Sequence, residues 1–180
     1  MKKILLLLLF SISFAFSQES INYQTPSSEI LELVEYDRPP SVTYDRDKNF
    51  MLFLYRDNYK SIEDLSQKEL RLAGLRINPK KNIGSRITYY NNVKIKNLKS
   101  KNPEINDIIG IPNNPLIANI NWSPNQKNIA FTNTSSDGVR LWVLNLESRS
   151  LTKLSDLKLN SNIGDVINWV NDNEIIVKVI

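Results

Sequence analysis

The second half of the chain alternates short apolar runs with short polar segments rich in Asn, Ser and Asp. The runs have the usual length of a β-strand and contain many β-branched and aromatic residues. Asp137-Gly138, between two of these runs, is typical of a tight β-hairpin. The pattern predicts four consecutive antiparallel strands, at residues 117–122, 129–132, 139–146 and 151–154.

The first half starts in the same way and then changes its period. Strands are predicted at residues 41–44 and 50–55, on either side of a charged turn. Residues 57–86 are interpreted as helical, because Ser66 and Glu69 have the spacing of a capping box and Gly74 fits a helix end. Strand patterns return over residues 87–98, and a loop is expected at residues 100–107.

Residues 18–40 are predicted to form a leader with a short amphipathic helix. Thr25 is placed to cap this helix, with Pro26 at its first position, where the missing N–H is not needed. The apolar side chains expected on one face are those of Ile30, Leu33 and Val34, and Pro39-Pro40 ends the element.

Three strand–turn–strand units repeat along the chain. Tyr44, Trp122 and Trp169 each end an apolar run directly before a polar turn, and an apolar run follows each turn. Trp122 and Trp169 are 47 positions apart; Tyr44 and Trp122 are 78 apart, or 48 without the 30-residue segment 57–86. A period of about 40–50 residues is typical of the four-stranded blades of β-propellers.

The predicted fold is therefore mainly β, an incomplete and unclosed β-propeller with a short N-terminal helix and a helical insertion in its first blade. A plain β-sandwich with three similar hairpins is the alternative. Because propellers close with about four to eight blades, and an open ring would leave the last strand as a bare edge, we expect residues 1–180 to be the N-terminal part of a longer chain. The predicted segments are a first blade at residues 41–115 with the insertion at 57–86, a second blade at 116–160, and the start of a third at 161–180.

The N-terminus has the layout of a secretory signal peptide. Lys2 and Lys3 precede an apolar core at residues 4–16, and Ala15-Phe16-Ser17 fits a cleavage site before Gln18. A core of 13 residues, two of them serines, is too short for a membrane-spanning helix, which needs about 20 apolar residues. The sequence thus predicts removal of residues 1–17, export to the periplasm or the exterior, and no membrane association of the mature chain.

Composition narrows the possible chemistry. The formal charge of +4 falls to +2 without residues 1–17, and the lysines at positions 80, 81, 94, 96, 99 and 101 lie among Asn and Ser, so no nucleic-acid partner is expected. The chain has no cysteine and no histidine. These absences exclude thiol nucleophiles, thiolate metal sites and a Ser-His-Asp triad within these 180 residues. Neither a G-x-S-x-G elbow nor a phosphate-binding glycine motif occurs. We therefore assign no catalytic, cofactor-binding or metal-binding residue and expect no cofactor.

Two stretches carry a resemblance to known proteins. NWSPNQKNIAFTNTSSDGVRLWVLNLES resembles a blade of TolB-type propellers, although Asn125-Gln126 replaces the usual Asp-Gly and Val170 replaces the serine expected after Trp169. SIEDLSQKELRLAGLRINPKKNIGSR, preceded by YQTPSSEILELVEYDRPPSV, resembles the start of secreted bacterial peptidases of the prolyl-oligopeptidase family, in its glutamyl-endopeptidase-like branch. The resemblance implies a serine peptidase whose propeller gates peptide access to a downstream α/β-hydrolase domain of the same chain. That domain and peptide substrates are the implied partners.

Two other functions stay open from the residues alone. The chain could be an exported propeller that binds a protein or glycan without catalysis. A glycosidase would need paired carboxylates, and the turn residues available for this are Asp45, Asp47, Asp137, Asp165 and Asp172. Around the insertion, the arginines at positions 56, 71, 76 and 86 could bind acidic groups of a substrate, but they are expected to pair with Glu63, Asp64 and Glu69. The N-x-[ST] matches at Asn121 and Asn133 are read as chance.

Overall fold

The computed structural model describes residues 24–180, which fall into two units, the first ending at Tyr36 and the second spanning Asp37–Ile180. The predicted signal peptide and residues 18–23 of the leader lie outside the described residues. Neither helix within residues 24–180 has the length and apolar character needed to cross a membrane.

The first unit contains helix α2 (Ser28–Val34). The helix confirms the predicted element, but its cap is Ser27, so the assignment of Thr25 and Pro26 to its start is wrong. The Ser27 carbonyl accepts hydrogen bonds from the backbone N–H groups of Ile30 and Leu31, at 3.1 and 3.0 Å. The first turn is therefore held by the backbone carbonyl of Ser27, whose side chain makes no capping hydrogen bond.

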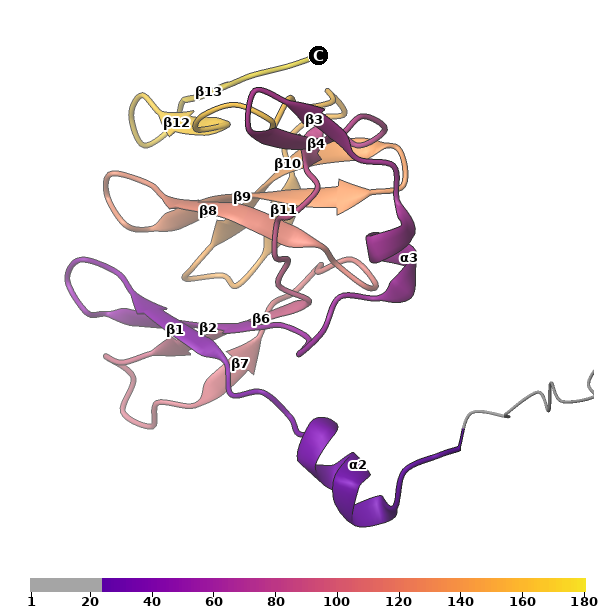
Figure 1. The fold of residues 1–180 in the computed structure, drawn as a ribbon. Coiled ribbons are helices and arrows are strands. Elements are labelled where there is room, and N and C mark those ends of the chain that lie inside the picture. The colour runs from indigo at the N-terminus through magenta and orange to yellow at the C-terminus, as the bar shows by residue number, and fades with distance from the viewer. Residues whose placement is uncertain (1–23) are drawn as a thin grey trace, which may run out of the picture. The chain divides into compact units, whose positions relative to one another are not determined.

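The second unit is built from antiparallel sheets whose strands follow one another along the chain (Figure 1). The first sheet has four strands in the order β1-β2-β6-β7, and the second has β8-β9-β10-β11. A third sheet consists of the hairpin β12-β13. The strands of these three sheets are β1 (Ser41–Tyr44), β2 (Phe50–Tyr55), β6 (Asn92–Asn97), β7 (Ile105–Asp107), β8 (Ile117–Trp122), β9 (Asn128–Ser135), β10 (Gly138–Asn145), β11 (Leu151–Lys153), β12 (Ile167–Trp169) and β13 (Ile175–Val177).

The mainly β prediction is confirmed, and the four strands predicted within residues 116–160 form one antiparallel sheet. Two details of the first sheet are wrong. Residues 105–107, expected in a loop, form its fourth strand, because Lys94, Ile95 and Lys96 of β6 pair with them. Residues 87–91 precede β6 and are joined to the second sheet through the bridge between Tyr90 and Ile117.

Strand β9 is apolar on both faces, and each face contributes to a different core. Ile129 and Phe131 pack with Leu52 and Ile95 of the first sheet. Ala130, between them in sequence, packs with Ile167 of the third sheet. Because successive side chains of a strand point to opposite faces, the second sheet lies between the other two. It buries apolar surface on both sides.

The turns after β1, β8 and β12 are linked from sheet to sheet. The Arg46 N–H donates to Gln126 Oε1 at 3.0 Å, and the Asn125 N–H donates to Asp172 Oδ1 at 2.8 Å. The residues that directly follow Tyr44 and Trp122 make the same hydrogen bond across their turns, in which the side chain accepts from a backbone N–H five residues later. Asp45 Oδ1 accepts from the Phe50 N–H at 2.6 Å, and Ser123 Oγ accepts from the Asn128 N–H at 3.0 Å.

The first two of these turns have a left-handed residue at the same place. Gln126 has a φ of 60° and Lys48 a φ of 55°, and both lie four residues after the aromatic. Val170 replaces the Asp or Ser that caps the other turns, and its N–H bonds to the Glu174 carbonyl, so the third turn is one residue shorter. The replacement of the expected serine by Val170 therefore coincides with a different turn.

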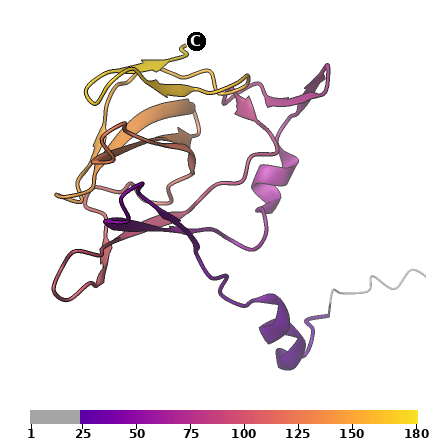
Figure 2. The ribbon, with the colours of Figure 1, turned by 90° about the vertical axis from the view of Figure 1, so that its left-hand side faces the viewer.

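The helical interpretation of residues 57–86 is wrong for most of its length. Helix α3 (Ile62–Ser66) is a single short helix capped by Ser61, whose hydroxyl accepts from the Asp64 N–H at 3.1 Å. A three-stranded antiparallel sheet follows, made of β3 (Leu70–Leu72), β4 (Leu75–Asn78) and β5 (Ile83–Gly84). Figure 2 shows this insertion, in magenta, on one side of the stacked sheets.

The turn between β3 and β4 explains the error. Ala73 and Gly74 have φ values of 45° and 85°, as a two-residue hairpin with two left-handed positions requires. The residues read as a helix end, around Gly74, are thus a hairpin turn. Apolar residues at 70, 72, 75 and 77 pair across it, so the strand period of two was present in LRLAGLRIN.

Candidate functional site

A cleft of about 640 Å³ lies between the insertion and the strands that flank it. Its walls come from the segment after β2, from α3, from β5 and the residues that follow it, and from Leu116 before β8. The charged side chains of this insertion cleft are mostly basic. They are Arg38, Arg56, Lys60, Arg71, Lys81 and Arg86, against Asp57, Asp64 and Glu69.

Glu69 is the acceptor around which the insertion is organised. Its Oε1 accepts from Arg76 Nη1 at 2.8 Å and from Arg71 Nε at 3.0 Å, and its Oε2 lies 3.5 Å from Arg86 Nε. The Ser85 hydroxyl also donates to Oε2. This hydrogen bond and those from Arg71 and Arg76 lower the pKa of Glu69 from 4.5 to about 2. One ionised carboxylate therefore connects β3, β4 and the segment after β5.

Replacing Glu69 by glutamine should make the insertion less stable in a pH-dependent way. Because the folded pKa is lowered, the carboxylate stabilises the fold above about pH 4.5, and this contribution is lost as the pH falls toward 2. Urea unfolding of the wild type and E69Q should thus differ at pH 7 and converge near pH 2. The exposed Glu63, on α3, supplies the control E63Q. A difference between E69Q and the wild type that does not change with pH would contradict this role.

The expectation that the arginines pair locally is confirmed for three of the four. Arg71, Arg76 and Arg86 all meet Glu69, while Asp64 accepts from the Ser61 hydroxyl at 3.1 Å. Arg56 differs: its Nε is buried and has no hydrogen-bond partner among the described residues. Lys60 lies beside it on the cleft wall and donates to the Ser85 carbonyl at 3.2 Å.

Several residues of this cleft were not singled out from the sequence. They are Ser85, Arg38 and Lys60. Ser85 reaches the cleft because β5 returns beside β4 and pairs with it through Ile77 and Asn78. The alternation of LRLAGLRIN was the signal that would have predicted the hairpin, and with it the convergence on Glu69.

Three of the five turn carboxylates considered for a glycosidase, Asp45, Asp137 and Asp172, make structural contacts. Asp45 and Asp172 lie at the linked turns and bind the backbone N–H groups of Phe50 and Asn125. Asp137 lies at the other end of β9, an eight-residue strand. A strand of that length spans about 25 Å, well beyond the separation of roughly 5–10 Å that paired glycosidase carboxylates need. Asp137 is therefore not paired with the other two.

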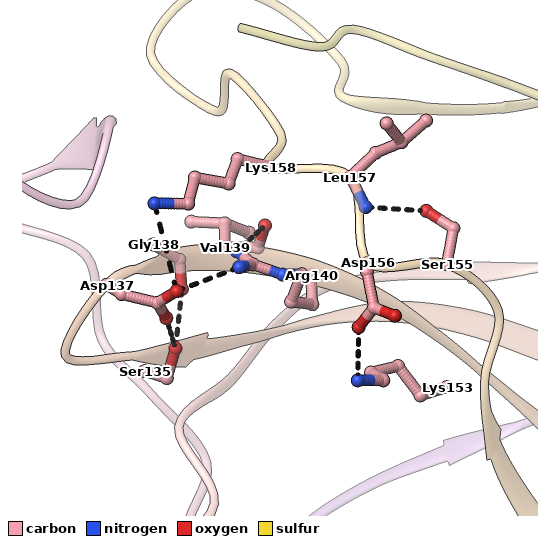
Figure 3. A network of polar contacts seen from close by, with 10 residues as sticks. All are labelled: Ser135, Asp137, Gly138, Val139, Arg140, Lys153, Ser155, Asp156, Leu157 and Lys158. Atoms are coloured by element: carbon pink, nitrogen blue, oxygen red, sulfur yellow. Dashed lines mark hydrogen bonds and ion pairs between the residues drawn. The ribbon is translucent and has the colours of Figure 1, made fainter.

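Asp137 belongs to a network at the β9–β10 hairpin (Figure 3). Its Oδ1 accepts from the Ser135 hydroxyl at 2.6 Å, and its Oδ2 lies 2.9 Å from Arg140 Nη2 and 3.8 Å from Lys158 Nζ. The serine hydrogen bond and the two cations lower the pKa of Asp137. The carboxylate is thus held in its charged form, as expected of a structural ion pair.

The two asparagines with glycosylation-like spacing are both engaged inside the fold. Asn121 Nδ2 donates to the Ile167 carbonyl at 3.0 Å, and Asn133 Oδ1 accepts from the Leu116 N–H at 2.8 Å. The Asn121 contact joins the second sheet to the third, and attaching a glycan to that amide would disrupt it.

The chain was compared with protein-family models and with curated proteins. No family model matches the chain. A curated protein from Oryza sativa subsp. japonica, named as a probable chloroplastic glutamyl endopeptidase, is 30% identical over 173 residues. An Arabidopsis thaliana protein with the same name is 30% identical over 169 residues. The chain is therefore similar in sequence to part of two proteins named as probable glutamyl endopeptidases.

The similarity extends over most of this chain but over little of its relatives. It covers 89% of the chain and 18% of the rice protein, and 88% of the chain and 17% of the Arabidopsis protein. The chain therefore spans less than a fifth of the length of these curated relatives. Its similarity to them is distant, and it includes the insertion as well as the sheets.

The chemistry within the chain is limited by its residue types. The 180 residues contain neither histidine nor cysteine. Within residues 24–180, no group of three or more carboxylates is arranged to hold a metal ion. The insertion cleft combines a positive lining with one strongly ionised carboxylate. This arrangement suits binding and positioning of polar groups. The carboxylate that accepts from the Ser85 hydroxyl is Glu69, whose pKa of about 2 makes it a weak base.

Proposed function

We propose that residues 41–180 are the beginning of a β-propeller in an exported serine peptidase of the prolyl-oligopeptidase family. In this proposal the propeller takes no part in the chemistry. It restricts which peptides reach an α/β-hydrolase domain that follows residue 180 and supplies the serine, aspartate and histidine. The sheets at residues 41–115 and 116–160 would be the first two blades, and residues 161–180 would begin the third.

The observation that carries the proposal is the repeat. Two four-stranded antiparallel sheets and the first hairpin of another pack face to face, with Trp122 and Trp169 at equivalent positions. The repeat occurs in a chain 30% identical to probable glutamyl endopeptidases more than five times its length. Blades that are apolar on both faces need neighbours on both sides. The packing of β9 fits that requirement.

The gene product that contains these residues should react with a fluorophosphonate probe, whereas a polypeptide of residues 1–180 should not. The reason is that the probe needs a serine activated by a histidine, and this chain has no histidine. The reading frame beyond codon 180 should encode a G-x-S-x-G elbow followed by aspartate and histidine. Changing the elbow serine to alanine is the control and should abolish labelling.

Two results would overturn this function. Labelling of a residue within 1–180 would show that the chain contains its own nucleophile. A reading frame with further sheets, a stop codon and no elbow would favour an exported binding module without catalysis.

A further inference from the structure

The insertion cleft contains cations that no acidic group of the described residues neutralises. Two of its basic side chains, Arg71 and Arg86, meet Glu69. A third, Lys60, donates to the Ser85 carbonyl at 3.2 Å. The remaining three have no side-chain hydrogen bond or ion pair with any residue between 24 and 180, and they are Arg38, Arg56 and Lys81.

Arg56 is the least satisfied of these three cations. Its Nε atom is shielded from solvent and has no hydrogen-bond partner in the described part of the chain. A guanidinium carries five N–H donors in a rigid fork and stays charged at every physiological pH. Burying a donor of this kind is unfavourable unless an acceptor reaches it. An anion bound in the cleft would supply that acceptor.

The carboxylates of the cleft are already engaged elsewhere. Asp57 Oδ1 accepts from Asn91 Nδ2 at 2.6 Å, and Asp64 Oδ2 accepts from the Ser61 hydroxyl at 3.1 Å. Glu69 is occupied by the arginines and the serine described above. The lining has six basic and three acidic side chains, which leaves an excess of three positive charges. An anion with two negative charges balances this excess more fully than a carboxylate, which has one.

The size of the cleft indicates that the anion is one end of a larger molecule. A volume of about 640 Å³ lies within the range of roughly 300–1,000 Å³ that is usual for small-molecule sites. The walls also contain apolar and aromatic side chains, among them Tyr59, Leu65 and Leu116. Tyr59 is 68% exposed and Leu65 69%, so an organic group bound beside them would remove apolar surface from water.

We propose that the insertion cleft binds a small organic phosphate monoester, with Arg56 as the main ligand of the phosphate and Arg38 and Lys81 as further cations. A guanidinium can donate two parallel N–H bonds to one phosphate group. A phosphate monoester carries two negative charges near neutral pH, since its second pKa is about 6. This binding function is separate from peptidase chemistry and does not depend on the propeller assignment.

The test is isothermal titration calorimetry of the full-length gene product with phenyl phosphate, benzoate and inorganic phosphate at constant ionic strength. Phenyl phosphate should bind at least about tenfold more tightly than benzoate, which has one charge, and than inorganic phosphate, which has no ring. Its affinity should also rise between pH 5 and 7.5. The cleft has no histidine, the side chain that ordinarily titrates in this range, so the rise follows the second ionisation of the ligand. Absent binding of phenyl phosphate, or an equal affinity for either other probe, would overturn the proposal.

Substitutions locate the binding site. Arg56→Gln and Lys81→Gln should each weaken the binding of phenyl phosphate, by about tenfold or more for Arg56→Gln. Lys101→Gln, in the exposed loop between β6 and β7, removes the same charge outside the cleft and should change the affinity by less than about twofold. Circular dichroism establishes that Arg56→Gln is folded, and Lys81→Gln tests the same cleft without removing a partly buried side chain.

Two outcomes of the variant series would overturn the proposal. Unchanged affinity in both cleft variants would place the ligand elsewhere on the protein. An equal loss in Lys101→Gln would show a general attraction of the basic surface for anions. Fluorophosphonate labelling reports on the proposed peptidase independently of either result, because that probe reacts with an activated serine and not with the cleft.

Discussion

Replacing Phe131 by alanine should lower the free energy of unfolding by about 3–5 kcal/mol, the usual cost of truncating a buried aromatic residue. Phe131 is 3% exposed and lies in β9, at the centre of the core between the first and second sheets. Its neighbours come from both sheets and include Leu52, Ile95 and Leu144. Because these side chains are held by backbone pairing within their own sheets, they are poorly placed to fill the cavity. The measurement is urea unfolding of the 180-residue chain followed by circular dichroism.

Ile176→Ala is the control for this experiment. Ile176 is an apolar strand residue of β13 that is 63% exposed, so its truncation should change the free energy of unfolding by no more than about 0.5 kcal/mol. A loss below about 1 kcal/mol for Phe131→Ala would show that the first and second sheets do not share a core. That result would also contradict the face-to-face packing of the sheets, on which the proposed function depends.

The sheets could be predicted from sequence because their signals are local. Each strand–turn–strand unit repeats the same aromatic, polar turn and apolar run, and the hairpin at Asp137-Gly138 follows from turn chemistry alone. The bounds of β1, β2 and β8 agree with those expected from the pattern. A repeated unit is also informative in itself, since three copies of one weak signal reinforce each other.

The insertion was predicted wrongly because two local signals compete in its sequence, the capping-box spacing and the alternation of LRLAGLRIN. Ser66 and Glu69 have capping-box spacing, yet Glu69 lies beyond the end of α3, where it accepts hydrogen bonds from Arg71 and Arg76. Pairing of β4 with both β3 and β5 outweighs the local helix preference, which is a weak term once tertiary contacts are available. The links between turns, such as Arg46 with Gln126, depend on how the sheets stack. No local pattern encodes them.

Trp169→Ala should destabilise the 180-residue chain by about 2–4 kcal/mol, whereas Tyr44→Ala should cost less than about 1 kcal/mol. The two aromatics occupy equivalent positions in the repeat, but only Trp169 has a preceding sheet to pack against. Its ring is partly buried against the core between the second and third sheets, and its Nε1–H donates to the Asn121 carbonyl at 3.3 Å. Tyr44, at 51% exposed, has little contact to lose.

The conservative variant Trp169→Phe separates the two contributions of this side chain. It keeps most of the ring packing and loses the hydrogen bond, so about 1 kcal/mol of the effect should remain. Urea unfolding of Trp169→Ala, Trp169→Phe and Tyr44→Ala gives the comparison. Equal losses for Tyr44→Ala and Trp169→Ala in the 180-residue chain would contradict this difference in packing between the two aromatic side chains. In the full-length protein the cost of Tyr44→Ala should instead rise toward that of Trp169→Ala, because a covered tyrosine becomes the same kind of contact between sheets.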